Sequence, residues 1–206
     1  MALYVNGFEE AGGFTTSGEY NESLKNVIKN FQQHYGLSVN GKLDLKTWLS
    51  LLISCGDTSR SAVGCDCITI ITEDNIDVLK HNGIKYIGRY LSKTINGTDY
   101  SLSNAEVRLL YKNGIRLFPI FQGAANRVSY FTIEQAKLDA SNAVKHLKRL
   151  NIQFGAIVYF AVDCDVMDYQ ITNSILPYFK QLYFSFIGES LGQYRLGIYG
   201  ARNVCS

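Results

Sequence analysis

Residues 158–169 read VYFAVDCDVMDY, a mostly apolar run that leads into two acids, Asp163 and Asp165. A short apolar run rich in β-branched and aromatic residues is typical of a buried strand. Successive side chains on a strand point to opposite faces, so one face is expected to be apolar. The other face then carries Tyr159, Ala161, Asp163 and Asp165. The stretch therefore predicts a buried strand with two acids at its carboxyl end.

Strand-like runs and helical stretches alternate on both sides of this strand. Strands are expected at 62–67, 84–91, 115–121, 156–163 and 194–200, and helices at 73–83, 103–114, 132–150 and 171–190. Ser103 with Glu106, and Thr132 with Gln135, have the spacing of capping boxes. Repeated strand–helix units predict a parallel sheet, either doubly wound or a (β/α) barrel. No glycine-rich phosphate loop follows a strand, which argues against a nucleotide-binding domain.

Residues 1–55 have a helical period instead, and residues 56–61 have the composition of a linker. Leu24, Val27, Ile28 and Phe31 form one stripe of a helix, and Gly36 follows as a C-cap. Asp44 is the expected N-cap of a second helix. The sequence thus predicts a small helical domain before an α/β domain at 62–206.

Composition excludes several classes of function. The net charge is +2 and no basic patch stands out, so nucleic acid is not an expected partner. No apolar run reaches the roughly 20 residues of a membrane helix, and the first residues, MALYVNGFEE, lack the features of a signal peptide. The cysteine and histidine spacings fit no zinc motif, so neither a metal nor a cofactor is expected.

Polar or aromatic residues stand at the carboxyl end of each expected strand, where ligands bind in both α/β architectures. The candidate catalytic residues are Asp66, Asp163 and Asp165, and the candidate substrate-binding residues are Arg89, Tyr90, Gln122, Tyr159 and Tyr199. A carboxylate cluster suits glycoside cleavage, in which one acid protonates the leaving oxygen and another attacks or activates water. Holding a hard cation is the competing use of three aspartates. A structural use is a third reading, with Asp as a helix cap and Arg89 as a neutralising charge.

The order of residues in the N-terminal unit resembles the peptidoglycan-binding helical module of bacterial wall hydrolases. The resemblance lies in SLKNVIKNFQQHYGLSVNGKLDLKTWLSLL, residues 23–52, through Phe31-Gln32, Gly36-Leu37, Gly41, Asp44 and Thr47-Trp48. The resemblance implies that this unit binds peptidoglycan.

The second unit resembles the bacterial glycoside hydrolase-like domain that is related to lysozyme-like wall hydrolases. The motifs are GCDC, YIGRYLS, NGIRLFPIFQ, YFAVDCD and GIYGARNVC, in order along residues 64–205. The resemblance implies a TIM-type barrel that acts on or binds cell-wall glycans, with Asp66 as the first-strand acid and Asp163 with Asp165 as the fourth-strand pair. Five recognisable strands are fewer than the eight of a closed barrel, so the barrel is expected to be incomplete at its C-terminal end.

The expected function is that of an endolysin- or autolysin-type glycoside hydrolase with peptidoglycan, or another wall glycan, as partner. The expected location is the cell wall or the extracellular space, reached by lysis or by another export route. A non-catalytic wall-glycan-binding protein is the alternative, because the related lysozyme-like enzymes usually carry Glu where Asp165 stands. A metal-dependent polysaccharide deacetylase is a weaker option, since all three histidines fall on expected helices.

Overall fold

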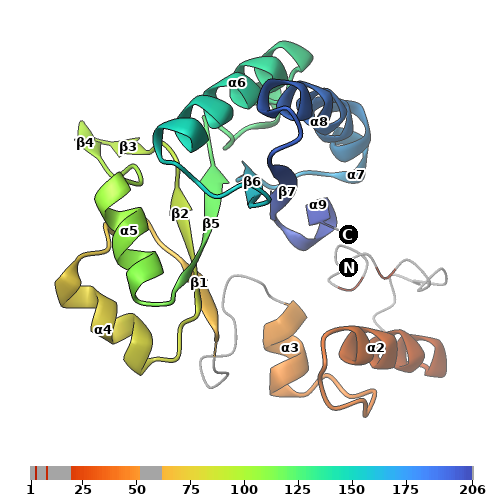
Figure 1. The fold of residues 1–206 in the computed structure, drawn as a ribbon. Helices are drawn as coiled ribbons and strands as arrows, with labels where there is room; N and C mark the ends of the chain where they lie inside the picture. Colours follow the sequence, from red (N-terminus) through yellow and green to blue (C-terminus); the bar gives the residue numbers. More distant parts are fainter. Residues whose placement is uncertain (1–2, 4–7, 9–19, 52–61, 206) are drawn as a thin grey trace. The chain divides into compact units, whose positions relative to one another are not determined.

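The computed structural model describes residues 3, 8, 20–51 and 62–205, apart from the side chains of residues 202 and 203 (Figure 1). The chain divides into two compact units, residues 62–200 and the described parts of 1–61 and 201–206. Each unit is described by itself.

The described parts of the unit formed by residues 1–61 and 201–206 include the helices α2 (Glu22–His34) and α3 (Leu45–Leu51) and, from the end of the chain, the short helix α9 (Arg202–Cys205). Its hydrophobic core contains the buried residues Leu3, Val27, Ile28, Phe31 and Leu51. The predicted N-cap of the second helix is confirmed, because Asp44 Oδ1 accepts hydrogen bonds from Thr47 N at 2.9 Å and from Thr47 Oγ1 at 2.7 Å. The predicted stripe in the first helix is confirmed as the buried face of α2.

A buried amide organises the loop between α2 and α3. Gln32 is fully buried, and its Oε1 accepts hydrogen bonds from the backbone N–H groups of Asn40 and Gly41 at 3.0 and 2.8 Å. Its Nε2 lies 2.9 Å from both Lys42 O and Thr47 Oγ1. Gly41 has a φ of 72°, a left-handed conformation that favours glycine. The Phe31-Gln32 and Gly41 positions of the motif therefore have a local structural use.

The second unit alternates strands and helices as predicted. Its elements are β1 (Gly64–Asp66), α4 (Glu73–His81), β2 (Tyr86–Tyr90), β3 (Thr94–Ile95), β4 (Thr98–Asp99), α5 (Asn104–Lys112), β5 (Arg116–Phe121), η1 (Val128–Tyr130), α6 (Ile133–Arg149), β6 (Ile157–Val162), α7 (Asp168–Gln170), η2 (Ile171–Ile175), α8 (Leu176–Ser190) and β7 (Arg195–Gly200). The β3–β4 hairpin was not predicted, although its turn, Asn96-Gly97, has the positive φ angles typical of a two-residue hairpin loop.

The main sheet is parallel, with the strand order β1-β2-β5-β6-β7. Each strand therefore lies beside the next sheet strand along the chain, and the order never reverses. A doubly wound sheet requires such a reversal. The strand order thus favours the barrel-like alternative of the two that the sequence left open.

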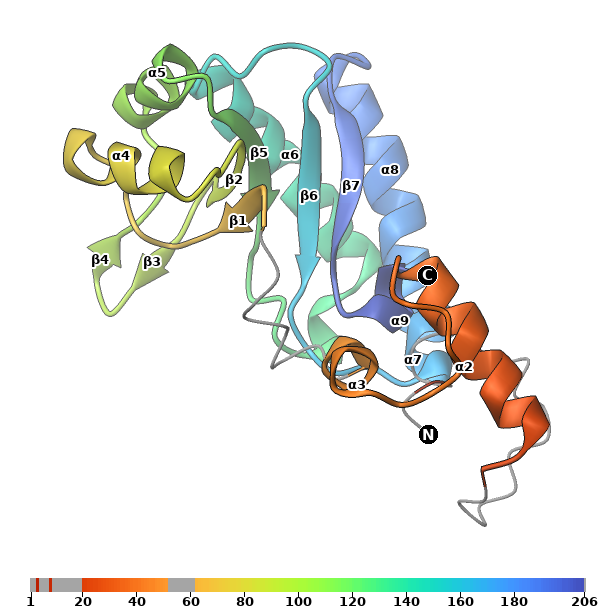
Figure 2. The same ribbon diagram turned by 90° about the horizontal axis from the view of Figure 1, so that it is seen from below.

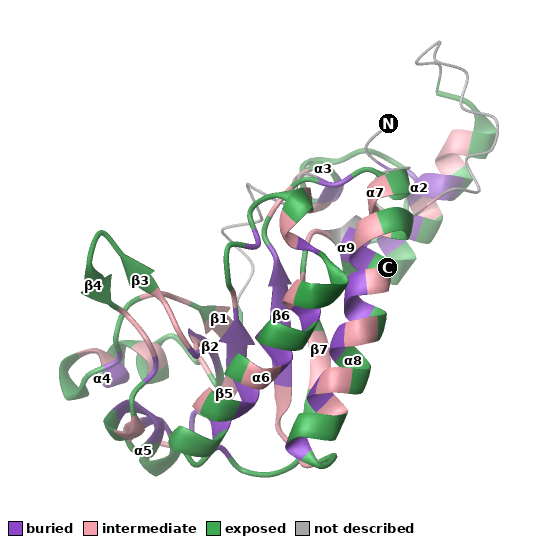
Figure 3. Ribbon diagram, turned by 90° about the horizontal axis from the view of Figure 1, so that it is seen from above, coloured by how far each residue is buried: buried purple, intermediate pink, exposed green. Residues whose placement is uncertain are grey.

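The helices cover one face of this sheet (Figure 2). Ile76 of α4 and Leu110 of α5 pack with Ile87 of β2, and Phe186 of α8 meets Phe160 of β6 at 5.3 Å between ring centroids. Figure 3 shows the buried residues of β6 and the buried stripes of α6 and α8. The opposite face carries Asp66, Gly88 and Phe118, which the strand register places side by side, and Tyr159 beside Gly197.

The barrel that the resemblance implies, expected to be incomplete, is not closed in the described residues. Strand pairing runs from β1 at one edge to β7 at the other, and no pairing joins these two edges. A barrel of this type closes with eight strands, so five form an open, curved sheet.

Candidate functional site

Five polar side chains meet at one edge of the parallel sheet. Asp66 ends β1, Tyr90 ends β2, Gln122 directly follows β5, Asp163 directly follows β6, and Tyr199 lies near the end of β7. The carboxyl ends of parallel strands lie at the same edge, so these residues are neighbours although the chain separates them widely. We call these five residues the acidic edge.

Each of the two carboxylates in the acidic edge accepts a hydrogen bond from a neutral donor. Gln122 Nε2 donates to Asp163 Oδ2 at 2.7 Å. The Tyr199 hydroxyl donates to Asp66 Oδ2 at 3.3 Å. The backbone of Asp163 is also fixed, because its N–H donates to Ala125 O at 2.8 Å. Both acids are exposed, so the edge is open to a ligand.

Both carboxylates of the acidic edge affect the pKa values of its two tyrosines, Tyr90 and Tyr199. Burial, followed by the charge of Asp66, raises the pKa of Tyr199 to about 12, and Asp163 adds to the shift. Burial also raises the pKa of Tyr90, again with contributions from Asp66 and Asp163. A negative charge opposes ionisation of a nearby phenol, so both tyrosines remain protonated donors at neutral pH. Asp66 and Asp163 therefore act on one shared space.

Two glycines allow aromatic rings to lie against the strands below this edge. A Cβ on Gly88 would stand 2.4 Å from the Phe118 ring and 2.7 Å from Asp66 Cβ. A Cβ on Gly197 would stand 2.8 Å from the Tyr159 ring. Tyr159 packs edge-on against Phe118, with 5.7 Å between ring centroids. The structure thus places Tyr159 on the floor of the site, and the glycines leave room for that floor.

Asp165 is not brought into the acidic edge by strand alternation. The strand β6 ends at Val162, so residues 163–167 form a loop in which the alternation no longer applies. Asp165 is exposed there. It lies close enough to Cys164 that burial, Asp163 and then Asp165 together raise the pKa of that thiol. Strand alternation therefore places neither Asp163 nor Asp165, because β6 ends before both residues.

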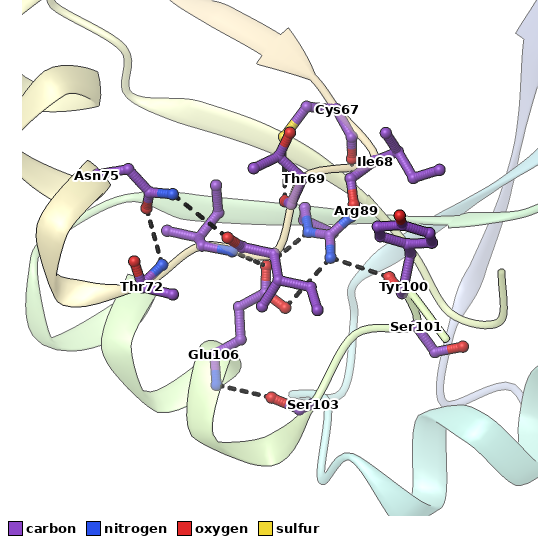
Figure 4. Close-up of polar contacts among 12 residues, drawn as sticks. Cys67, Ile68, Thr69, Thr72, Asn75, Arg89, Tyr100, Ser101, Ser103 and Glu106 are labelled. Carbon is purple, nitrogen blue, oxygen red and sulfur yellow. Dashed lines mark hydrogen bonds and ion pairs between the residues drawn. The ribbon is translucent and has the colours of Figure 1, made fainter. Parts of the chain in front are cut away.

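Arg89 is placed inside the protein (Figure 4). Its guanidinium is fully buried, and Nε and Nη2 donate to the two carboxylate oxygens of Glu106 at 2.5 and 3.3 Å. Nη1 donates to Cys67 O and Ile68 O at 2.8 and 3.0 Å, and Nη2 donates to Tyr100 O at 3.0 Å. All five guanidinium donors are thus used within the fold.

Strand alternation explains this placement. Arg89 points to the face opposite Gly88 and Tyr90, toward the helices rather than the ligand side. Its role is structural, since it ties the chain after Asp66 to the start of α5. We therefore leave Arg89 out of the proposed ligand-contacting residues. The expectation that it would neutralise the strand-end acids is also replaced, because its partner is Glu106.

The two predicted capping boxes form only in half. Ser103 Oγ and Thr132 Oγ1 accept hydrogen bonds from the N–H groups of Glu106 and Gln135, both at 3.1 Å, as predicted. The Glu106 side chain binds Arg89, and the Gln135 side chain donates to Asp139 at 2.8 Å. The capping-box spacing therefore located both residues but not their tertiary partners.

Neither a metal cluster nor a membrane span is found in the parts of the chain that the structure describes. No group of three or more His, Cys, Asp or Glu side chains there could hold a metal ion. None of the described helices has both the length and the hydropathy needed to cross a membrane.

Both parts of the chain match known protein families. Residues 77–206 match the Rv2525c-like, glycoside hydrolase-like domain. The chain belongs to this family. Residues 1–51 match a peptidoglycan-binding domain, so both units relate the chain to cell-wall glycans.

Two uncharacterized proteins of Bacillus subtilis (strain 168) are similar over nearly the whole chain. FadG is 37% identical over 209 residues, which cover 100% of this chain and 35% of FadG. YbfG is 37% identical over 213 residues, which cover 99% of this chain and 29% of YbfG. The chain thus spans about a third of the length of these two relatives.

Two solved structures share the fold. The Mycobacterium tuberculosis Tat-secreted protein Rv2525c, in complex with HEPES, has a TM-score of 0.52 and 20% identity, covering 65% of this chain and 66% of that one. An uncharacterized B. stearothermophilus protein has a TM-score of 0.50 and 20% identity, covering 66% of this chain and 59% of that one. At this identity the likeness concerns the fold alone.

Proposed function

We propose that this member of the Rv2525c-like family is a glycoside hydrolase-like protein directed at a bacterial cell-wall glycan, and that the acidic edge receives the glycan. The observation that carries the proposal is that Asp66, hydrogen-bonded by Tyr199, and Asp163, hydrogen-bonded by Gln122, lie at the same edge of the parallel sheet. Sugar hydroxyls donate hydrogen bonds to carboxylates and accept them from neutral donors such as phenols and amides. The acidic edge contains all three kinds of group. The family match and the peptidoglycan-binding match support the choice of glycan.

Hydrolysis is the first form of this proposal. Glycosidases use one carboxyl to protonate the leaving oxygen and a second to attack the sugar or to activate water. Asp163, oriented by Gln122 and by its own backbone hydrogen bond, is the proposed nucleophile or base. Asp66 and Asp165 are the proposed partners for protonation and for stabilising positive charge. Tyr90, Gln122, Tyr159 and Tyr199 are the proposed sugar contacts.

Binding without cleavage is the second form, and one observation favours it. General-acid carboxyls in glycosidases are commonly kept protonated by burial in an apolar pocket. Asp66, Asp163 and Asp165 are all exposed. An open acidic edge of this kind can hold a glycan through hydrogen bonds without cutting it.

The finer assignments of fold and location belong to the same proposal. Residues 1–55 are the proposed tether to peptidoglycan, residues 56–61 the linker, and residues 62–206 a domain of the (β/α) barrel type. The cell wall or the extracellular space is the proposed location, because the proposed ligand lies there.

The two forms are separated by incubating the protein with purified peptidoglycan and measuring both released reducing sugars and wall-bound protein. Under hydrolysis, Asp163→Asn lowers sugar release by at least about 100-fold, since general acid–base catalysis contributes about 10²–10⁴-fold. Asp77→Asn, an exposed aspartate of α4, is the matched control and leaves release unchanged. Wall binding with no sugar release from the unmodified protein identifies the binding form. Absence of both wall binding and sugar release refutes the proposed function.

A further inference from the structure

A second, smaller feature lies next to the acidic edge. It is a cavity of about 310 Å³ beside α6. Its walls come from Ser92, from residues 121–124 at the end of β5, from Tyr130 of η1, and from Gln135, Asp139, Asn142 and His146 of α6. The volume is at the lower end of the range for small-molecule sites. Gln122 belongs both to this cavity and to the acidic edge.

A buried carboxylate makes the back wall of the cavity rigid. Asp139 is only 2% exposed, and its oxygens accept hydrogen bonds from Tyr130 at 2.7 and 2.8 Å, from Tyr178 at 2.5 Å and from Gln135 at 2.8 Å. Burial, reinforced by Asp139, raises the pKa of both tyrosines well above the usual range. The phenols therefore stay protonated and keep donating, and the wall needs no ligand to complete it.

The wall is connected directly to Asp163. Gly123 passes so close to the Tyr130 hydroxyl that a Cβ on Gly123 would stand 2.0 Å from it. The residues around Gly123 hold Asp163 at two points, through the Gln122 side chain at 2.7 Å and through Ala125 O at 2.8 Å. One segment, residues 122–125, thus forms both a wall of the cavity and the support of a proposed catalytic acid.

The lining selects the charge and the polarity of a ligand. The amide N–H groups of Gln122 and Gln135 donate to Asp163 and Asp139, which leaves their Oε1 atoms as acceptors; no described residue donates to either. Asn142 adds an amide that both donates and accepts. The negative charge of Asp139 opposes an anionic ligand. The cavity therefore suits an uncharged group that offers hydroxyl and amide N–H donors.

We propose that this cavity is a subsite for one uncharged N-acetylhexosamine unit of the glycan, adjacent to the unit at the acidic edge. An acetamido group can donate to the free amide oxygens and accept from Asn142. Phe121 and Ala124 offer apolar surface to its methyl group. The inference rests on the proposed function, and it adds a discrimination against sugars that carry a carboxylate.

The test is a titration of the ¹⁵N-labelled full chain with N-acetylglucosamine, and separately with N-acetylmuramic acid, followed by two-dimensional NMR. N-acetylglucosamine is expected to shift the resonances of Gln122, Gly123 and Asn142, and N-acetylmuramic acid to bind at least about tenfold more weakly because its carboxylate meets Asp139. Asn142→Leu fills the cavity from an exposed helix position and removes a hydrogen bond, which raises Kd by at least about fivefold. Lys145→Leu, at another exposed position of α6, is the matched control and leaves Kd unchanged.

The outcomes separate this inference from the proposed function. Shifts confined to residues outside the cavity, or equal effects of the Asn142 and Lys145 substitutions, overturn the subsite. Tighter binding of N-acetylmuramic acid also overturns it. Peptidoglycan binding or cleavage that survives in such a case leaves the proposed function standing, whereas loss of both refutes the two together.

Discussion

The buried ion pair between Arg89 and Glu106 offers the sharpest test of the fold around the acidic edge. Glu106→Gln removes one charge of a pair whose side chains are 0% and 1% exposed. Three N–H groups donate to this carboxylate, two from Arg89 and one from Ile71, the last at 3.0 Å. Glutamine keeps one oxygen as an acceptor but turns an NH₂ group toward a guanidinium donor. Arg89 then stays buried with only neutral carbonyl partners.

The magnitude follows from this arrangement. Removing one partner of a buried ion pair costs about 3–5 kcal/mol. The retained amide oxygen saves a hydrogen bond worth about 1 kcal/mol, so the expected loss is at the lower end, about 3 kcal/mol. With a urea slope of about 2 kcal/mol per molar, the unfolding midpoint falls by about 1.5 M. A domain with a stability of about 5–15 kcal/mol remains folded after this loss.

The assay is urea unfolding followed by far-UV circular dichroism. Glu189→Gln is the matched control, because Glu189 is an exposed residue near the end of α8, and it should change the stability by no more than about 0.5 kcal/mol. A loss of less than about 1 kcal/mol for Glu106→Gln would refute the reasoning, since it would mean that Arg89 finds another counter-charge or reaches water. The same substitution should weaken ligand binding, because Arg89 holds the carbonyls of residues 67 and 68 directly after Asp66.

Three further results are expected. In an alkaline absorbance titration, the difference between the protein and Tyr199→Phe shows an ionisation near pH 12 rather than 10, and Asp66→Asn lowers the pKa of Tyr199. The fold favours the neutral phenol, so the contribution of Tyr199 to stability is complete below pH 10 and is lost as the pH rises from 10 to 12. Gly123→Ala forces the new methyl group against Tyr130 and lowers the free energy of unfolding by about 1–3 kcal/mol; unchanged stability in urea would contradict the close approach. NMR titration of His146 gives a pKa below 6.5, because burial disfavours its charged form, so its contribution to stability is present above about pH 6.5 and is lost as the pH falls through the lowered value; a pKa at or above 6.5 would contradict the burial.

Local sequence patterns were sufficient for the secondary structure and for much of the site. Short apolar runs predicted all five strands of the sheet, and the rule that parallel strands end at one edge correctly brought Asp66, Tyr90, Gln122, Asp163 and Tyr199 together. The Asn96-Gly97 dipeptide is typical of a two-residue hairpin loop, so the β3–β4 hairpin was also predictable from the sequence.

Longer-range contacts were not accessible in the same way. Glu106 pairs with Arg89 across 17 residues, and Asp139 accepts from Tyr178 across 39. A capping-box spacing is satisfied by the backbone of the first turn, so it says nothing about where a long side chain points afterwards.

The sequence by itself thus determined the strands, the helices and the edge at which the polar residues gather, because side-chain periodicity and strand direction are local properties of the chain. Only the tertiary structure decided what those residues contact. Strand alternation does not reach Asp165, because β6 ends at Val162. Strand alternation sends Arg89 to the helix face, and only the tertiary structure brings a buried carboxylate and three carbonyls there to accept its hydrogen bonds. The partners of Arg89 lie 11 to 22 residues away along the chain, so no local pattern predicts them.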